Sequence, residues 1–168
     1  RSWMPHIPIV AIDIHTGEKV WTFNTIPQEG EPGRETWEDD SWFNRGGANA
    51  WSILSVDPDL GIVYIPTGAA QHDFYGGDRD GMNWYANSLV AVDGKSGEYL
   101  WHFQTVHHDL WDYDVPAQPN VVDLNVNGKA IPAVAQVSKT GFVYLLYRKT
   151  GEPVFPIFEK EVPQSDIP

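Results

Sequence analysis

An eleven-residue pattern occurs twice in this chain, at residues 11–21 and again at residues 91–101. Both copies read Ala-x-Asp-x-x-(Ser/Thr)-Gly-Glu-x-x-Trp, and a weaker copy at 145–155 keeps Thr-Gly-Glu but ends in Phe155. The Asp can accept hydrogen bonds from the turn, and the Gly can adopt a positive φ. Each copy therefore predicts a tight hairpin, and we expect its closing tryptophan to wedge against the next unit.

Hairpins that cannot bury an apolar face alone must stack, so the repeat predicts a β-propeller built from antiparallel blades. Short β-branched and aromatic runs recur along the chain, and no window has a 3.6-residue apolar period. The fold class is therefore all-β, with unrelated hairpins of a β-sandwich as the alternative. The expected strands are 8–13, 19–25, 52–57, 62–67, 87–93, 98–106, 120–125, 131–137, 141–147 and 153–158.

The order of these strands predicts where the loops lie. Residues 1–25 would close one blade, 51–106 would form a complete blade, and 120–158 the next. In a meander, alternate connections lie at opposite ends, and rigidly held long loops often carry function. We therefore expect one end to present the connections 26–51, 68–86, 107–119 and 138–140, with the residues Trp51, His72, Asp73, His107, Asp109, Asp112, Asp114 and Lys139.

The segment 107–114, His-His-Asp-Leu-Trp-Asp-Tyr-Asp, gathers two histidines, three aspartates and a tryptophan in eight residues. Its three acids could hold a hard cation, one of them could act as a general base, or each could simply cap a turn. Zinc is disfavoured, because adjacent histidines on an extended chain point to opposite sides. Trp51 could pack in the core or form a platform for a planar ligand. Lys139 could be solvated or could pair with an anionic ligand.

Composition excludes several classes of function. The 168 residues carry a net charge of −12 without a basic run, which argues against nucleic acids and anionic membrane surfaces as partners. The absence of cysteine excludes disulfides and thiolate metal sites. No apolar run approaches the roughly 20 residues that cross a bilayer. Because the chain starts at Arg1 and runs almost at once into a strand, we expect a piece of a longer protein.

Residues 101–119, together with the tryptophan repeat, closely resemble the pyrroloquinoline quinone (PQQ)-dependent dehydrogenases, particularly their glucose dehydrogenase branch. The resemblance implies about three four-stranded blades of an eight-bladed quinoprotein propeller. It also implies oxidation of a sugar or alcohol C–OH, with a quinone or cytochrome as electron acceptor. The implied location is the periplasm, with any membrane anchor outside this sequence.

The resemblance also implies roles for single residues. Asp112 matches the catalytic aspartate, Lys139 the residue that contacts the quinone oxygens, and Trp51 the tryptophan that stacks beneath the quinone ring. Asp112 and Asp114 are the expected ligands of Ca²⁺ or of another divalent or lanthanide ion. One departure concerns Ala69, which stands where methanol dehydrogenases have a metal-binding asparagine; this favours the sugar or polyol branch.

Two rival functions use the same repeat. A non-catalytic scaffold of the cell envelope would not need Trp51, Asp112 and Lys139 to converge. A carbohydrate-binding propeller would use exposed aromatic side chains without a lysine or a metal ion.

Overall fold

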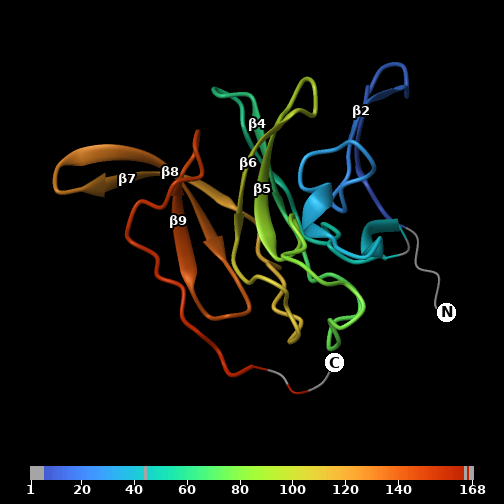
Figure 1. Cartoon of the computed structure of the whole chain (residues 1–168). Coiled ribbons are helices and arrows are strands. Elements are labelled where there is room, and N and C mark those ends of the chain that lie inside the picture. Colours follow the sequence, from blue (N-terminus) through green and yellow to red (C-terminus); the bar gives the residue numbers. More distant parts are fainter. Residues whose placement is uncertain (1–5, 44, 165, 167–168) are drawn as a thin grey trace.

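The computed structural model describes residues 6–43, 45–164 and 166 and contains three antiparallel sheets (Figure 1). The only helical segments in this part of the chain are two 3₁₀ turns, η1 (Arg34–Thr36) and η2 (Ser41–Phe43), so the all-β prediction is confirmed. The strands are β1 (Ile9–Ile12) and β2 (Lys19–Phe23), then β3 (Ser55–Asp57), β4 (Ile62–Pro66), β5 (Ser88–Asp93) and β6 (Tyr99–Gln104), and finally β7 (Asn120–Val126), β8 (Lys129–Val137) and β9 (Val143–Tyr147).

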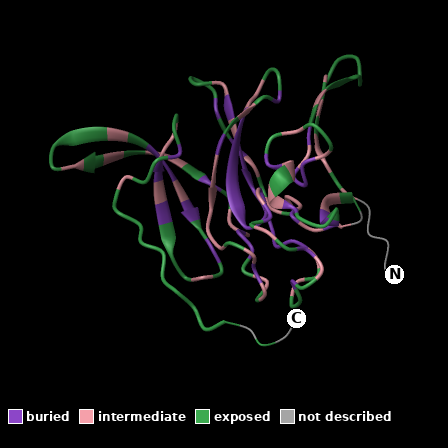
Figure 2. Cartoon of the chain, viewed as in Figure 1, coloured by how far each residue is buried: buried purple, intermediate pink, exposed green. Residues whose placement is uncertain are grey.

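Strand β5 is the centre of the packing, because its apolar side chains are buried on both faces (Figure 2). Leu89 and Ala91 point toward the third sheet, where they join a core cluster with Val134 and Leu146. Val90 and Val92 point the other way and pack in a cluster with Phe23 of the first sheet. Alternate residues of a strand face opposite sides of a sheet, so this one strand joins both neighbouring sheets to the middle one.

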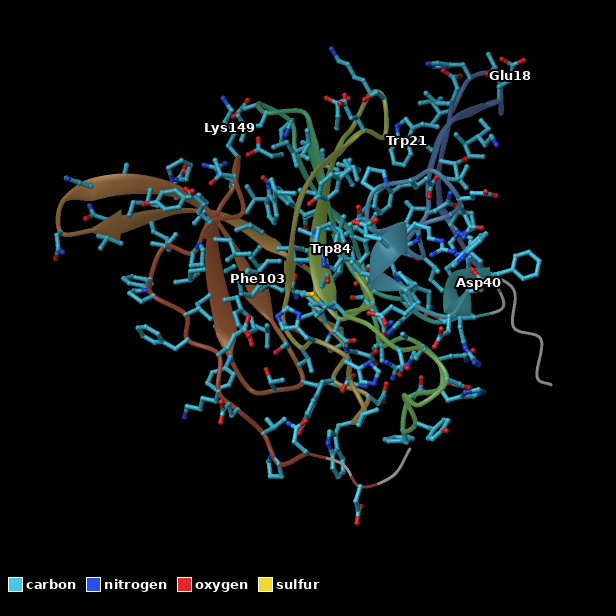
Figure 3. The ribbon with its side chains drawn as sticks, viewed as in Figure 1. Glu18, Trp21, Asp40, Trp84, Phe103 and Lys149 are labelled. Carbon is cyan, nitrogen blue, oxygen red and sulfur yellow. The ribbon has the colours of Figure 1, made fainter. Side chains whose placement is uncertain are left out.

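The two repeat tryptophans do join neighbouring sheets. Trp21, at the end of the first sheet, lies beside the β5–β6 hairpin (Figure 3) and donates an indole hydrogen bond to the Gly94 carbonyl at 3.1 Å. A Cβ atom added to Gly97 would meet the Trp21 ring at 2.7 Å, so the indole packs directly on the bare turn. Trp101 repeats the arrangement one sheet further on, donating to the Arg148 carbonyl and covering Gly151.

The turn chemistry expected from the repeat is also present. Asp13 Oδ1 accepts hydrogen bonds from the backbone N–H groups of residues 15 and 16, and Asp93 Oδ1 does the same for residues 95 and 96. These hydrogen bonds lower the pKa of both carboxyl groups. Gly17 and Gly97 have φ values of 74° and 73°, the left-handed conformation that favours glycine.

The tenth predicted strand, 153–158, was wrong. The third sheet has only three strands, and the segment makes an isolated bridge from Leu146 to Pro153 and one hydrogen bond from Val154 N to Leu145 O. Pro153 and Pro156 lack the N–H groups that a β-ladder needs, so the pairing with β9 does not extend beyond these two contacts. Residues 155–164 are exposed instead.

Most connections divide between the two ends of the sheets as the strand order predicts, whereas the β7–β8 turn lies at the left of Figure 1 and the connection 26–51 runs down its right side. The turns of the β1–β2, β3–β4 and β5–β6 hairpins lie at the top of Figure 1, whereas the connections 68–86, 107–119 and 138–141 lie at the bottom. The lower end therefore carries the candidate site. No helix in the described part of the chain is long and apolar enough to span a membrane.

Candidate functional site

Asp109 shapes the acidic loop from inside the protein. Its carboxylate is buried and accepts hydrogen bonds from Trp111 N at 2.9 Å, from Tyr113 N at 2.6 Å and from Asn87 Nδ2 at 2.8 Å. Its carbonyl oxygen accepts a hydrogen bond from the buried guanidinium of Arg79. The position of Asp109 in the sequence suggested that it belongs to an open anionic cluster with the other two acids. The structure shows that it does not. Because its oxygens are taken up by N–H groups, it acts as a support for the loop.

This support presents Asp112 to the solvent side. Asp112 lies between the two backbone amides that Asp109 binds, and its own φ is 56°. A left-handed φ in a residue other than glycine costs of order 1 kcal/mol and persists where neighbouring contacts require it. The side chain is half-exposed and lines a cavity, whereas Asp109 behind it is closed off.

Lys139 reaches the acidic loop from the β8–β9 turn. Its backbone N–H donates to the Asp114 carbonyl at 3.2 Å, and its Nζ donates to Asp112 Oδ2 at 2.8 Å and to Asp114 Oδ2 at 2.5 Å. Burial acts to lower the pKa of Lys139, but the hydrogen bonds and charges of the two carboxylates raise it above its ordinary value. One ammonium therefore joins both acids, although they lie far from it in the sequence.

Asp114 ties the loop to the end of β4. It is mostly buried, and its Oδ1 accepts a hydrogen bond from Ala69 N at 2.7 Å. A Cβ atom on Gly68 would lie 2.6 Å from that oxygen and 3.2 Å from Trp51 Nε1, so only glycine fits without displacing them. Gly68 therefore allows the indole and the carboxylate to approach the same stretch of backbone.

A cavity of about 310 Å³ opens where these groups meet. Trp51 is 56% exposed, unlike a core tryptophan. Much of one wall is backbone, because the segment 46–49 pairs with 68–71 and Gly47 has no room for a side chain. The cavity is lined by Ile7, Gly46, Gly47, Asn49, Trp51, Ala69, Gln71, Asp73, Asp112 and Asp114. A flat indole, a backbone wall and a nearby ammonium suit a planar, negatively charged guest.

Asp73 is the third carboxylate of this cavity. Burial raises its pKa, and the charges of Asp112 and Asp114 raise it further, while Lys139 and His72 act in the opposite direction. Asp73 therefore interacts electrostatically with the same two aspartates that Lys139 joins. The sequence placed it on the correct end of the sheets but gave no sign that it lines the cavity.

The histidines have other partners. His72 lies 3.3 Å from Asp78, which also pairs with Arg45, and His107 contacts Gln104 and Glu159. Within the described ranges, no group of three or more His, Cys, Asp or Glu side chains has an arrangement that could hold a metal ion. His107 and His108, which the zinc alternative would need to bring together, contact different groups, Glu159 and the Gly81 carbonyl.

Sequence reasoning missed the residues that brace the loops. Arg79 and Asn87 are fully buried and polar, and their contacts with Asp109 depend on the path of the 68–86 connection. The small-residue run around Gly46 and Gly47 indicates close backbone approach, but to the segment 68–71, so it does not identify Arg79 or Asn87.

Comparison with known proteins gives one family. The family described as "PQQ: Glucose/ethanol/alcohol dehydrogenase, beta-propeller domain" matches residues 4–168. Quinoprotein glucose dehydrogenase A of Acinetobacter calcoaceticus is 42% identical over 157 residues, which cover 91% of this chain and 19% of that protein. The quinoprotein glucose dehydrogenase of Escherichia coli K12 is 40% identical over 158 residues, covering 94% of this chain and 20% of its own length. The chain thus spans about a fifth of these relatives.

Solved structures agree with the sheet arrangement. The quinohemoprotein alcohol dehydrogenase of Comamonas testosteroni superposes with a TM-score of 0.81 at 27% identity, over 90% of this chain and 25% of that one. A europium-containing methanol dehydrogenase gives a TM-score of 0.77 at 28% identity, over 88% of this chain and 29% of that one.

Proposed function

This chain belongs to the PQQ-dependent glucose/ethanol/alcohol dehydrogenase β-propeller family, and on that premise we propose that it supplies the general base of a quinoprotein oxidoreductase. The substrate would be a sugar or an alcohol, oxidised at a C–OH group. The observation that carries the proposal is the junction of Asp112, Asp114 and Lys139 at the edge of a cavity that also exposes Trp51. The three segments involved come from separate connections at one end of the sheets.

The residues present fit PQQ, which when bound would supply the two-electron oxidant. PQQ is flat and anionic, and the exposed indole of Trp51 offers it a stacking surface. The ammonium of Lys139 offers a charge-assisted hydrogen bond to its oxygens. The wall around Gly47 is formed by backbone, because the paired segment 69–71 leaves no space for a side chain at that residue. The rest of the site would come from other parts of a full propeller.

Asp112 has the geometry of a proton acceptor. Its Oδ2 is held by Lys139 Nζ at 2.8 Å, while its Oδ1 makes no hydrogen bond to any described residue. Oδ1 can therefore receive the proton of a substrate hydroxyl in the cavity. The hydrogen bonds of Asp109 to the flanking amides hold this carboxylate in place, so little reorganisation is needed when the substrate arrives.

A metal ion fits the described residues less well. Asp112 and Asp114 provide oxygen donors of the kind that Ca²⁺ or a lanthanide ion takes, but both Oδ2 atoms are bound to Lys139. The described residues hold no set of three ligands around one point. Any further ligands for such an ion would come from outside this sequence.

The proposal extends to the setting of the enzyme. The electron acceptor would be a quinone or a cytochrome, and the location would be the periplasm. Both follow from the family resemblance alone. They can be tested by fractionating cells and by following reoxidation with quinone analogues or cytochrome c.

The test uses the full-length protein with the substitution Asp112→Asn. Turnover of sugars and alcohols, measured by dye reduction, should fall by about 100-fold or more, because the general base is lost. PQQ affinity, measured by quenching of tryptophan fluorescence, should change less than threefold. Asp59→Asn, an exposed acid in the β3–β4 turn, is the matched control and should behave as wild type.

Other outcomes identify the rival functions. Near-normal turnover of the Asp112→Asn protein would remove Asp112 as the base. No saturable PQQ binding by the wild-type protein would favour the non-catalytic scaffold. Sugar binding at equilibrium without dye reduction would favour a carbohydrate-binding propeller.

A further inference from the structure

Among the carboxylates that line the cavity, Asp73 is set apart because no described residue makes a hydrogen bond or ion pair with it. Asp109 is bound by three N–H groups, Asp114 by Ala69 N and Lys139, and Asp78 by Arg45. Asp73 makes no hydrogen bond or ion pair with any residue that the structure describes. It nevertheless lines the same cavity as Asp112. Its two oxygens are therefore free to bind a guest in that cavity.

The loop that carries Asp73 is held from two sides. The Tyr75 N–H donates to the His72 carbonyl at 3.2 Å, closing a turn around Asp73, and Arg79 donates to the same carbonyl at 3.4 Å. Gly76, just beyond the turn, packs against His108 so closely that a Cβ atom would overlap its imidazole. Asp73 is thus presented by a braced segment, as a recognition residue needs to be.

The chemistry of the cavity separates the roles of its acids. Asp112 is directed by Lys139 and would receive the proton of the reacting hydroxyl. A sugar or polyol has further hydroxyl groups on neighbouring carbons, and a free carboxylate can accept hydrogen bonds from them. A monohydric alcohol has no such group and gains nothing from a second carboxylate.

We propose that Asp73 is a specificity-determining residue that accepts hydrogen bonds from the non-reacting hydroxyl groups of a sugar or polyol substrate. This inference rests on the proposed function, because it assigns the substrate class of the same cavity. It selects polyols by their additional hydroxyls and leaves monohydric alcohols to bind through Asp112 alone.

The kinetic test compares Asp73→Asn and Asp73→Ala with wild type in the full-length, PQQ-loaded protein. The substrates are D-glucose, glycerol and 1-propanol. For the polyol that wild type oxidises, kcat/KM should fall roughly 10- to 100-fold, the usual effect of losing a hydrogen bond to a charged group. For 1-propanol it should change less than threefold. Asp80→Asn, an exposed acid of the same connection, is the control and should leave both values unchanged.

A binding measurement gives a readout that does not depend on turnover. In the Asp112→Asn background, calorimetric titration with the polyol should show at least tenfold weaker binding when Asp73→Asn is added. Thermal melting of each variant checks that the fold is retained. Asp73 is half-exposed and has no hydrogen-bond or ion-pair partner among the described residues, so both variants should melt within about 2 °C of wild type.

Three results would overturn the inference. Equal losses for glucose and 1-propanol would make Asp73 a general part of the cavity. No change in either would make it a solvated surface acid. If wild type neither binds PQQ nor oxidises any substrate, the proposed function itself fails, whereas the first two results leave that function standing and remove only the role of Asp73.

Discussion

The carboxylate of Asp109 accepts the backbone N–H of Tyr113 at 2.6 Å, four residues along the chain. The same carboxylate accepts the N–H of Trp111 at 2.9 Å, so it binds the residues on both sides of Asp112. A buried anion with three N–H donors makes the loop rigid without using a metal ion or an opposite charge on its oxygens. The position of the proposed base is therefore set by a second aspartate that does not reach the cavity.

Asp109→Asn should disturb that position. An amide has two donor hydrogens, so at least one of the N–H groups of Trp111, Tyr113 and Asn87 would face another donor. We expect a loss of roughly 2–3 kcal/mol in the free energy of unfolding, since a buried group is left without its hydrogen bond. Urea unfolding of the full-length protein measures it.

The same substitution should lower kcat by about 100-fold, because a displaced base reacts slowly even when the cofactor is bound. Asp59→Asn serves again as the control. If Asp109→Asn keeps wild-type kcat despite its lower stability, Asp109 supports the fold but does not position Asp112.

Gly151→Ala tests the docking of one sheet on the next. A Cβ atom at this position would lie 2.5 Å from the Trp101 ring, and the residue has a φ of 72°. The left-handed backbone costs roughly 1 kcal/mol and the overlap with the indole about 1–3 kcal/mol more. We therefore expect the free energy of unfolding to fall by about 2–4 kcal/mol, as measured by urea denaturation.

Gly128→Ala separates these two contributions. Gly128 has a φ of 80° with nothing within 4 Å of the added Cβ, so it carries the backbone cost alone. A difference below about 0.5 kcal/mol between the two variants would show that the indole yields easily, and that the contact with Gly151 does little to join the sheets.

The repeat contained most of what was needed to foresee this docking. Asp, Gly and Trp at fixed spacing define a local turn and a ring at its end, and both depend mainly on residues near each other in sequence. The convergence of Trp51, Asp112 and Lys139 was also foreseeable, because strand order alone decides at which end each connection lies.

What the sequence could not give depends on burial and on the paths of long connections. Asp109 and Asp112 belong to one short acidic segment, yet one is closed off and the other lines a cavity. The difference arises from contacts with Asn87 and Arg79, which are brought close only by the fold. The absence of the tenth strand could have been predicted from the local sequence, since Pro153 and Pro156 lack the N–H donors that a β-ladder needs. The similarity of residues 145–155 to the two earlier repeats led instead to the prediction of a strand.

His102 predicts a pH dependence of stability. Its Nδ1 is hydrogen-bonded to Tyr99 Oη at 2.9 Å, and its ring packs among Trp84 and Tyr85. Burial, helped by the charge of His107, lowers its pKa from 6.5 to about 4. Between pH 6.5 and 4 the imidazole of His102 is protonated in the unfolded chain but stays neutral in the native protein. The free energy of unfolding therefore keeps its full contribution from His102 above pH 6.5, and this contribution is lost as the pH falls toward 4. The full loss is roughly 3 kcal/mol.

Urea unfolding of the full-length protein at pH 4, 5, 6 and 7 measures this effect. His102→Gln should be less stable than wild type at pH 7, and the gap should narrow as pH falls from 6.5 to 4. His15→Gln, in an exposed turn, is the matched control and should run parallel to wild type. A constant gap between wild type and His102→Gln across this range would mean that folding does not shift the pKa of His102.

Lys139 has two possible tasks, and substitution separates them. Its Nζ lies within 2.8 Å of one oxygen each of Asp112 and Asp114, so it offsets part of their negative charge, and we also propose that it contacts PQQ. Lys139→Met keeps the length of the side chain but removes the charge.

If Lys139 both binds the two aspartates and contacts PQQ, PQQ should bind roughly 10- to 100-fold more weakly to the Lys139→Met variant of the full-length protein, because a charge-assisted hydrogen bond is lost. Fluorescence quenching measures this affinity, and Lys139→Arg should restore part of it. Lys149→Met, an exposed lysine at the opposite end of the sheets (Figure 3), should have no effect. A lower melting temperature with unchanged PQQ affinity would show that Lys139 serves the two aspartates alone.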